Sequence, residues 1–304
     1  MVALANDTRA LPRSCLGEEQ WEAFARDGFL RLGAVCAPDL LERLRSRIDA
    51  IMMGEHMVNP PLYMQVCPSS MSSTWADSQN VAAGAAPPRT LAYRKIMGLE
   101  GDDVFRGYML QPLFEHIATR VCGRDVAIVR AMFFNKPKER GKVIDWHQDR
   151  EEQNMLPQLR PALGDANITM WTALDPSSTE SGCLQVIAGS HKFGAVPFGP
   201  TSADAPTLSR DQLRHFAPED RRVELEMDAG ECVLLHNLLL HKSGLNGTGQ
   251  PRRAFSTWLT SHRPGTEHFA TAFPAFRPNL KHEPQGRDGG GGSGSLMAST
   301  GPNL

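Results

Sequence analysis

The sequence predicts a mainly β protein, a sandwich or barrel of short strands, with a layer of helices ahead of it in the chain. From residue 126 onward, short apolar runs alternate with turn signals such as "DPSSTESG", "DAG" and "SGLNGTG". Most of these runs have no segment between them long enough for a crossover helix, which argues against a parallel α/β sheet. The runs are "VAIVRAMFF", "KVIDWH", "ITMWTAL", "CLQVI", "RVELEM", "ECVLLH" and "RAFSTWLTS".

The N-terminal part carries apolar residues at helical spacing. Residues 18–28 predict a helix that ends at Gly28, and the apolar run "FLRLGAV" after it predicts a short strand. A second helix is expected to begin at Pro38, because proline suits the first helical position. Residues 102–122 return to helical spacing, with a break or a restart at Pro112.

Two polar insertions interrupt this pattern. Residues 54–92 are rich in Pro, Ser, Ala and Met and show no clear period, and residues 196–222 are a second polar, Pro-containing stretch. Long loops in a compact domain are usually functional or disordered. We therefore expect these segments to shape a substrate pocket, which Tyr63, Met64 and Trp75 either line or only pack beside.

Composition limits the classes of function. The chain has 304 residues, 41% of them hydrophobic, and a formal net charge of −2. This balance gives no reason to expect nucleic acid or an anionic membrane as a partner. The N-terminus has no apolar run of signal-peptide length, and no segment approaches the ~20 apolar residues that cross a bilayer. The six cysteines form no CxxC pair, so we expect a protein of the reducing cytoplasm.

The stretch "DWHQDREE" places His147 two residues before Asp149. On a strand, side chains at i and i+2 point to the same side, so an imidazole and a carboxylate there can converge on one cation. Alone, this pattern is a weak signal, because a solvated polar turn has the same composition. The segment "LLHNLLLHKSGLN" adds His236 and His241, and two histidines with one carboxylate form the facial triad of non-haem Fe(II) oxygenases.

Several of these candidates have a competitor nearby. His236 and His241 are five residues apart and would face opposite sides of one regular strand, so only one is expected to bind metal. Arg252 and Arg253 open a later strand, where one inward-facing arginine would hold a dicarboxylate cosubstrate through a bidentate pair. The basic run "KPKERGK" at 136–142 predicts a lysine-rich surface turn, with attraction of an anionic substrate as its functional alternative.

Three motifs, in this order, resemble the phytanoyl-CoA dioxygenase family of Fe(II)/2-oxoglutarate oxygenases: "WHQD", then "GCLQVIAGSHK", then "LLHKSGLNGTGQPRRAFS". The resemblance covers most of residues 18–265 and includes the eleven-residue step from His241 to Arg252. It implies a double-stranded β-helix, or jelly roll, of the cupin-like type behind a layer of N-terminal helices.

The same resemblance implies one oxygenase domain over residues 1–285. A helical part at about 17–122 would precede a jelly-roll core at about 126–265. Residues 286–304, rich in Gly and Ser, are expected to form a flexible tail.

The resemblance also assigns a site. It implies that His147, Asp149 and His241 bind Fe(II) and that Arg252 binds the far carboxylate of 2-oxoglutarate. We expect His191, in the turn "AGSHK", to be structural. The resemblance disfavours His236 and Asp145 as metal ligands and Arg253 as the cosubstrate-binding arginine. The further neighbours that it implies for the cosubstrate are Lys95, Met132, Gln148, Trp171 and Ser243.

The expected function is that of a non-haem Fe(II)/2-oxoglutarate-dependent dioxygenase that uses O₂, with ascorbate as a stimulant. It would hydroxylate, desaturate, epoxidise or cyclise a small metabolite, and Asp149 argues against halogenation because related halogenases have a small residue there. An acyl-CoA or fatty-acid hydroxylase is the alternative, and a non-catalytic metal-binding jelly roll or a zinc hydrolase stays open. We expect a monomer or homodimer whose partner is its small-molecule substrate in natural product biosynthesis.

Overall fold

A computed structural model describes residues 15–58, 62–67, 79–80, 87–138, 143–149, 167–197 and 208–261. The strands of the large sheet are β1 (Phe29–Ala34), β2 (Tyr63–Val66), β3 (Gln79–Asn80), β4 (Tyr93–Met97), β5 (Val126–Lys136), β7 (Asn167–Ala173), β10 (Glu231–His236) and β12 (Arg252–Ser261). Those of the small sheet are β6 (Ile144–His147), β8 (Leu184–Ile187), β9 (Arg222–Leu225) and β11 (His241–Ser243).

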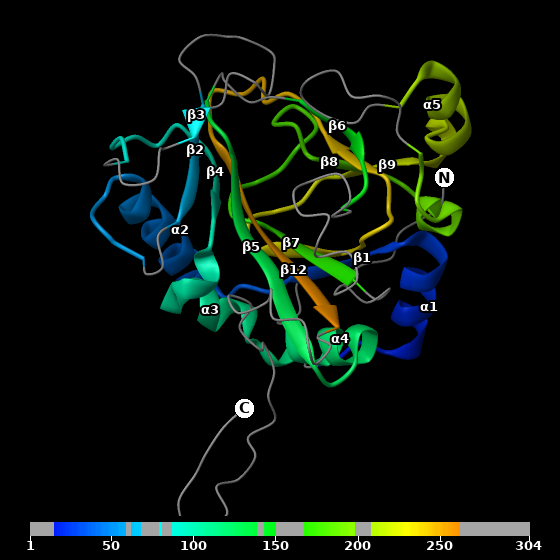
Figure 1. Cartoon of the computed structure of the whole chain (residues 1–304), viewed down its shortest axis with the longest axis horizontal. Coiled ribbons are helices and arrows are strands. Elements are labelled where there is room, and N and C mark those ends of the chain that lie inside the picture. The colour runs from blue at the N-terminus through cyan, green and yellow to red at the C-terminus, as the bar shows by residue number, and fades with distance from the viewer. Residues whose placement is uncertain are drawn as a thin grey trace, which may run out of the picture.

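The two sheets are antiparallel and face one another, as the predicted jelly roll requires (Figure 1). The large sheet has eight strands in the order β1-β10-β7-β12-β5-β4-β2-β3, and the small sheet has four in the order β6-β11-β8-β9. Most neighbours in both orders are not consecutive along the chain. Residues far apart along the chain therefore meet between the sheets.

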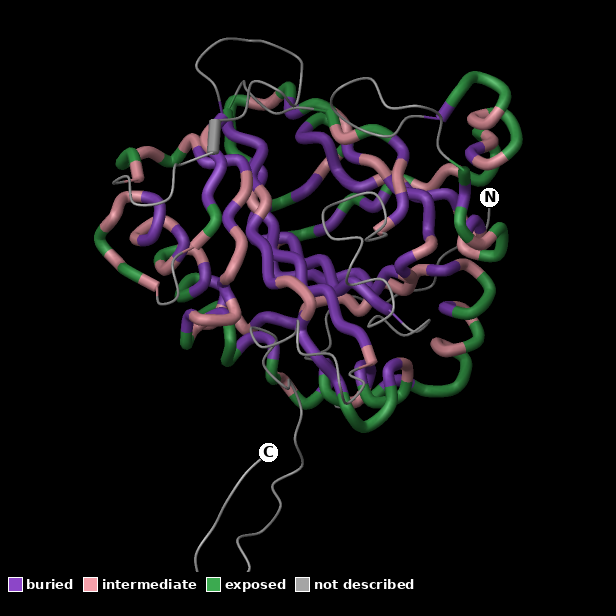
Figure 2. The backbone as a smooth tube through the Cα atoms, viewed as in Figure 1, coloured by how far each residue is buried: buried purple, intermediate pink, exposed green. Residues whose placement is uncertain are grey.

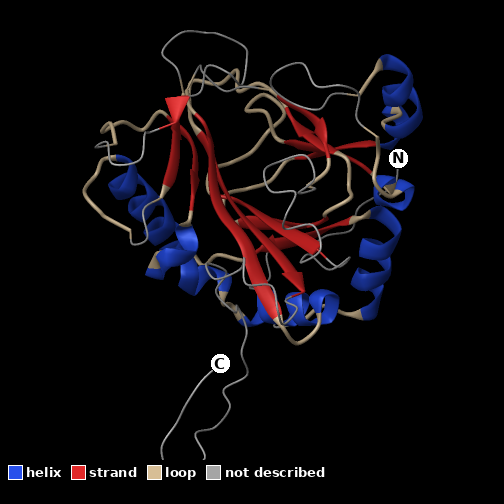
Figure 3. Ribbon diagram, viewed as in Figure 1, coloured by secondary structure: helices blue, strands red, loops and turns tan. Residues whose placement is uncertain are grey.

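Helices surround this β core, as Figure 3 shows. They are α1 (Glu18–Asp27), α2 (Pro38–Met52), α3 (Asp103–Met109), α4 (Pro112–Cys122) and α5 (Arg210–Phe216), with 3₁₀ turns η2 (Leu99–Gly101), η5 (Ser190–Phe193) and η6 (Glu219–Arg221). The predicted boundaries hold, because Pro38 and Pro112 open their helices and Gly28 ends α1 with a φ of 80°. Only glycine adopts that left-handed conformation without strain.

The main core lies between helices α2 to α4 and the outer face of the large sheet, in the band of buried backbone in Figure 2. Phe255 of β12 packs against Phe105 and Tyr108 of α3, with ring centroids 4.8 and 5.7 Å apart. Such aromatic contacts stabilise a core beyond the area they bury. The outer face of the sheet is thereby closed, and its inner face is left for the site.

A smaller apolar cluster lies between the two sheets. It includes Trp171 and Val233 from the large sheet and Val186 and Leu225 from the small sheet. Because side chains alternate along a strand, the residues between these positions face outward. The cluster holds the sheets face to face over part of the interior.

The 54–92 segment differs from the expectation of irregular structure. It contributes β2 and β3 to the edge of the large sheet, where β2 pairs with β4 and β4 with β5. These strands form because β5 offers a free edge, which no local pattern reveals. Met64 is buried in the helix-side core, whereas Tyr63 lies partly exposed on β2. Trp75 and the 286–304 tail lie outside the described residues.

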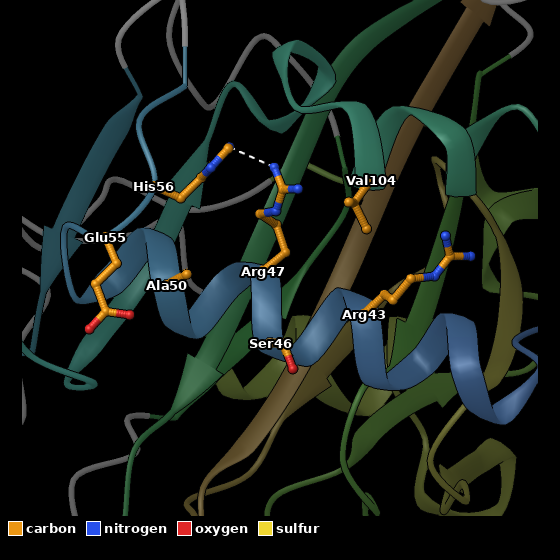
Figure 4. Close-up of a pocket in the computed structure, with 7 residues that line it drawn as sticks. All are labelled: Arg43, Ser46, Arg47, Ala50, Glu55, His56 and Val104. Carbon is orange, nitrogen blue, oxygen red and sulfur yellow. Dashed lines mark hydrogen bonds between the residues drawn. The ribbon is translucent and has the colours of Figure 1, made fainter.

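One ion-pair cluster ties α2 to α3 beside a surface pocket of about 450 Å³, drawn in Figure 4. The buried Asp102 accepts hydrogen bonds from the backbone N–H groups of Val104 and Phe105, and so caps α3. The guanidinium of Arg47 donates to the same carboxylate at 2.7 Å and contacts His56 at 2.6 Å. The pocket residues are Arg43, Ser46, Arg47, Ala50, Glu55, His56 and Val104.

We predict that Asp102→Ala lowers the free energy of unfolding by about 3 kcal/mol, because it removes a helix cap and leaves Arg47 without its carboxylate. Urea denaturation at neutral pH measures this loss. Asp103→Ala, at an exposed position of the same helix, is the matched control and should cost less than about 0.5 kcal/mol. Equal losses in the two variants would contradict the role given to Asp102.

Candidate metal centre

Strand pairing brings two of the three predicted metal ligands together. His241 of β11 is the direct partner of His147 of β6, and their ring centroids lie 4.1 Å apart. Asp149 follows two residues after His147, so its carboxylate lies on the same side of the chain. One possible ligand atom from each of the three residues lies within 4.8 Å of the others. This is the spacing of groups that converge on one cation.

Backbone carbonyls orient both imidazoles. The Nδ1 of His147 lies 2.7 Å from the carbonyl oxygen of Asp145, and the Nδ1 of His241 lies 2.9 Å from that of Leu239. Each Nδ1–H therefore donates to a carbonyl, and each Nε2 keeps its lone pair. Metal-binding histidines are commonly held in this way.

The carboxylate of Asp149 links the two sheets. Its Oδ2 accepts a hydrogen bond of 2.9 Å from the Thr169 hydroxyl on β7, and its Oδ1 lies 3.9 Å from the His241 Nε2 and 4.0 Å from the Arg130 guanidinium. Burial alone would raise the pKa of Asp149, but the charges of His241, Arg130 and His147 lower it below its ordinary value. The group is therefore an anion in the neutral pH range, ready to bind a cation.

Burial and the neighbouring His241 lower the pKa of His147 to about 4. The imidazole is thus neutral near pH 7 and can act as a ligand. One anionic and one neutral donor, with a second imidazole opposite, match the donor set of non-haem Fe(II) sites.

Arg252 lies on the inner face of the large sheet, at the start of β12. The side chain is 2% exposed, donates to the Gly182 carbonyl at 2.9 Å, and stacks on Trp171 with 5.4 Å between the guanidinium carbon and the ring centroid. Burial lowers its pKa to about 10, so it stays charged near neutral pH. Its Nε has no hydrogen-bond partner among the described residues. A carboxylate would complete this environment.

Arg253 faces the opposite way, as alternation along the strand predicts. Its guanidinium binds Asp175 and Asp49 at 2.8 Å each, and Asp49 belongs to α2. Burial opposes the charge, but these carboxylates raise the pKa of Arg253 above its ordinary value. Arg253 therefore anchors the helical layer.

Three of the other implied neighbours lie on the inner walls. Met132 is buried on β5 opposite Ser256, and Ser243 lies on the same face of β11 as His241. Lys95 of β4 pairs with Phe134, and burial, with help from nearby arginines, lowers its pKa to about 7.

The side chain of Gln148, which the resemblance places beside the cosubstrate, makes three hydrogen bonds to the protein backbone. Its amide nitrogen donates to the carbonyls of Gly194 and Leu238, and its amide oxygen accepts from the backbone of Val196. The side chain of Gln148 thus points away from the two ligands that flank it, as alternation along an extended chain predicts. Its hydrogen-bonding groups are thus committed to holding that part of the chain.

The competing residues lie apart from the triad. His236 accepts a hydrogen bond from the backbone of Leu238 and packs near Phe24 and His191, with ring centroids 6.3 and 4.9 Å away. His191 contacts the Ala25 carbonyl, which ties η5 to α1 and agrees with a structural role. The exposed Asp145 carboxylate binds the backbone N–H of the next residue.

Sequence reasoning missed Arg130, Thr169 and Lys136. The first two contact Asp149, but neither belongs to a motif. Lys136 was read as part of a surface turn, yet it is 5% exposed and pairs with Arg252 across the sheet. The alternation "RAMFFNK" that puts Arg130 and Lys136 on one face was the available signal.

A jelly roll with an open His-Asp-His cluster between its sheets is the architecture of metal-dependent oxygenases. Residues 24–254 match the family model described as phytanoyl-CoA dioxygenase (PhyH). The chain therefore belongs to the phytanoyl-CoA dioxygenase family of Fe(II)/2-oxoglutarate-dependent oxygenases, and the resemblance seen in the motifs is confirmed.

Named relatives agree with this membership. The chain is 26% identical to the peroxisomal phytanoyl-CoA dioxygenase of Rattus norvegicus over 81% of this chain and 69% of that protein. It is 24% identical to Dioxygenase hkm4 of Aspergillus hancockii, over 78% of this chain and 68% of that protein.

Two crystal structures share the fold. The alpha-ketoglutarate-dependent carbocyclase SnoK from nogalamycin biosynthesis has a TM-score of 0.57 at 18% identity, over 86% of this chain and 92% of SnoK. EctD from S. alaskensis, crystallised with 2-oxoglutarate and 5-hydroxyectoine, has a TM-score of 0.59 at 19% identity, over 85% of this chain and 79% of EctD. In the part of the chain that is described, no helix has the length and hydrophobicity of a membrane span.

His236 gives a test of pH dependence. Burial and the nearby His191 lower its folded pKa to about 4, against an unfolded value of about 6.5. The unfolded chain binds the proton between these values and the folded chain does not, so stability falls as pH drops through the window. The wild type should therefore lose free energy of unfolding between pH 7 and pH 5. We predict that this loss is smaller by about 1 kcal/mol in His236→Gln, a figure that allows for the partial exposure of the side chain.

Urea denaturation at both pH values measures this difference. His215→Gln, at an exposed histidine on α5, is the matched control and should keep the full acid dependence of the wild type. An acid dependence that is the same in all three proteins would contradict the role of His236.

Proposed function

We propose that His147, Asp149 and His241 hold Fe(II), and that Arg252 holds the 5-carboxylate of 2-oxoglutarate, in a dioxygenase that oxidises a small molecule. The observation that carries the proposal is the pairing of His147 with His241 beside a carboxylate that charges keep ionised. The buried guanidinium of Arg252, with Trp171 under it and an unused Nε, supports the second half.

An iron–2-oxoglutarate centre, when bound, supplies oxidation of a substrate C–H bond by O₂, coupled to decarboxylation of the cosubstrate to succinate. The protein contributes position and electrostatics. Thr169 and the two backbone carbonyls hold the ligands in place, so little reorganisation accompanies loading. Arg252 orients the cosubstrate, and the apolar cluster between the sheets limits entry of water.

We favour a small metabolite of secondary metabolism as substrate, because SnoK acts in nogalamycin biosynthesis on the same fold. An acyl-CoA or fatty acid is the second candidate, since the rat relative is a phytanoyl-CoA dioxygenase. Six free cysteines, five of them buried, support a reducing compartment such as the cytoplasm. A monomer or homodimer stays our expectation.

Succinate formation tests the triad. The purified protein, reconstituted anaerobically with Fe(II) and then given 2-oxoglutarate and air, should release succinate even without substrate. We predict that Asp149→Ala reduces this release to background while the fold is kept, because the anionic ligand is lost.

Asp145→Ala is the matched control, because the Asp145 carboxylate is exposed and accepts a hydrogen bond from the backbone N–H of Trp146, and it should keep the wild-type rate. Circular dichroism checks the fold of both variants. A wild type that forms no succinate, but hydrolyses esters with Zn(II), would instead favour a hydrolase.

The neighbouring arginines give a second test. We predict that Arg252→Ala raises the 2-oxoglutarate concentration for half-maximal succinate formation about 10- to 100-fold, because a charged hydrogen-bonded pair is lost. Arg253→Lys should leave that concentration within about twofold, since Arg253 faces the helices, while lowering the melting temperature. The reverse outcome would move the cosubstrate role to Arg253.

A further inference from the structure

The start of β12, which carries Arg252, extends beyond one of its two neighbouring strands. On one side β12 pairs with β5 along its whole length, as far as Arg252. On the other side its pairing with β7 stops at Ala254, where β7 ends. Arg253 therefore lies beside the bend at Leu174 and Asp175. Its backbone needs hydrogen-bond partners from that bend.

The side chain of Asp175 takes the place of a strand partner there. In a regular antiparallel pair, Leu174 and Arg253 would exchange two backbone hydrogen bonds. One of them is made, from the N–H of Leu174 to the carbonyl of Arg253 at 3.0 Å. The N–H of Arg253 instead donates to Oδ2 of Asp175 at 3.0 Å, and the carbonyl of Leu174 accepts from Nε of Arg45 on α2 at 2.7 Å. A carboxylate thus completes the backbone ladder one residue after Arg252.

The Asp175 carboxylate is itself held from two sides. Asp175 is 8% exposed, and the guanidinium of Arg253 binds both of its oxygens, Oδ2 at 2.8 Å and Oδ1 at 2.9 Å. The Nε of Arg45 lies 3.5 Å from Oδ1. A bidentate pair between an arginine and a carboxylate fixes geometry as well as adding energy. Asp175 is therefore a fixed acceptor, and it fixes the backbone that donates to it.

The direction of the Arg252 side chain depends on that backbone. Its guanidinium is held by the Gly182 carbonyl and the Trp171 ring, and its Nε has no hydrogen-bond partner among the described residues. Since successive side chains of a strand face opposite ways, a local rotation of the chain here would turn Arg252 away from the space between the sheets. The backbone contact of Asp175 opposes such a rotation.

We propose that Asp175 is a positioning residue for the cosubstrate. By accepting the backbone N–H of Arg253, it holds the start of β12 so that Arg252 points between the sheets, toward 2-oxoglutarate. The inference deepens the proposed function and rests on it. Asp175 acts through Arg252 and through the backbone, so its contribution survives replacement of the Arg253 side chain, which agrees with the small effect expected of Arg253→Lys.

Calorimetric titration with 2-oxoglutarate tests this role, on the whole protein loaded anaerobically with Fe(II). Asp175→Ala should raise the Kd for 2-oxoglutarate about tenfold, because a small misplacement of a binding group is costly. The affinity for Fe(II) should stay within about twofold, since the two histidine ligands lie on the other sheet. Asp175→Asn keeps an oxygen that can accept the N–H, and it should bring the Kd back to within about threefold of the wild type.

Asp49→Ala is the matched control. Asp49 binds the guanidinium of Arg253 at 2.8 Å, as Asp175 does, but the backbone N–H of Arg253 donates to Asp175. The control should lower the melting temperature, because an ion pair between α2 and the sheet is lost, yet leave the Kd for 2-oxoglutarate within about twofold. A tenfold rise in Asp49→Ala would show that general loss of stability weakens binding, and would overturn the inference.

A double variant separates positioning from other effects. In an Arg252→Ala background, Asp175→Ala should raise the Kd by less than about twofold more, because a residue that acts through Arg252 has nothing left to position. A further tenfold rise there, or a wild-type Kd in the single variant Asp175→Ala, overturns the inference. If Asp175→Ala does not fold, Asp175→Asn decides. A Kd about tenfold above that of the wild type in this variant would exclude the backbone contact as the cause.

The wild type reports on the proposed function itself. If the Fe(II)-loaded wild type does not bind 2-oxoglutarate, both proposals are overturned. If the wild type binds it and Asp175→Ala binds it equally well, only the role of Asp175 is overturned.

Discussion

The pairing of β6 with β11 is the constraint on which the site depends. It sets His147 opposite His241 and leaves Asp149 just beyond the end of β6, where the carboxylate reaches the large sheet. Side chains alternate along a strand, so a slip of one residue in β11 would turn His241 out and Lys242 in. β8 pairs with β11 on its other edge and holds this register from both sides.

The two arginines at the start of β12 show how the inner face differs from the outer one. Arg253 finds two carboxylates and strengthens the contact between sheet and helices. Arg252 contacts the Trp171 indole and donates a hydrogen bond to the Gly182 carbonyl. These contacts do not offset the free energy that the charged group loses when it leaves water. Because a buried charge that is poorly compensated opposes folding, we proposed a carboxylate of the cosubstrate as the partner of Arg252.

The sequence predicts those parts of the arrangement that depend on local pattern, such as the direction of a side chain on a strand or the end of a helix. Alternation predicted that Arg252 and Arg253 face opposite ways, and proline and glycine marked the helix boundaries. Gln148 and the β2 to β4 edge could not be predicted in this way. The chain that covers Gln148 lies more than 40 residues away, at Gly194 and Leu238, and the edge strands form only because β5 is there to pair with.

The position of Arg130 follows from an irregularity in the sheet. The register between β5 and β12 shifts between Trp258 and Leu259, directly beside the pair that Trp258 makes with Arg130. A bulge increases the local twist and re-aims the side chains next to it. At the Arg252 end, by contrast, the pairing between the same two strands is regular. The twist at the Arg130 end directs its guanidinium toward Asp149, where its charge helps to lower the pKa of that carboxylate.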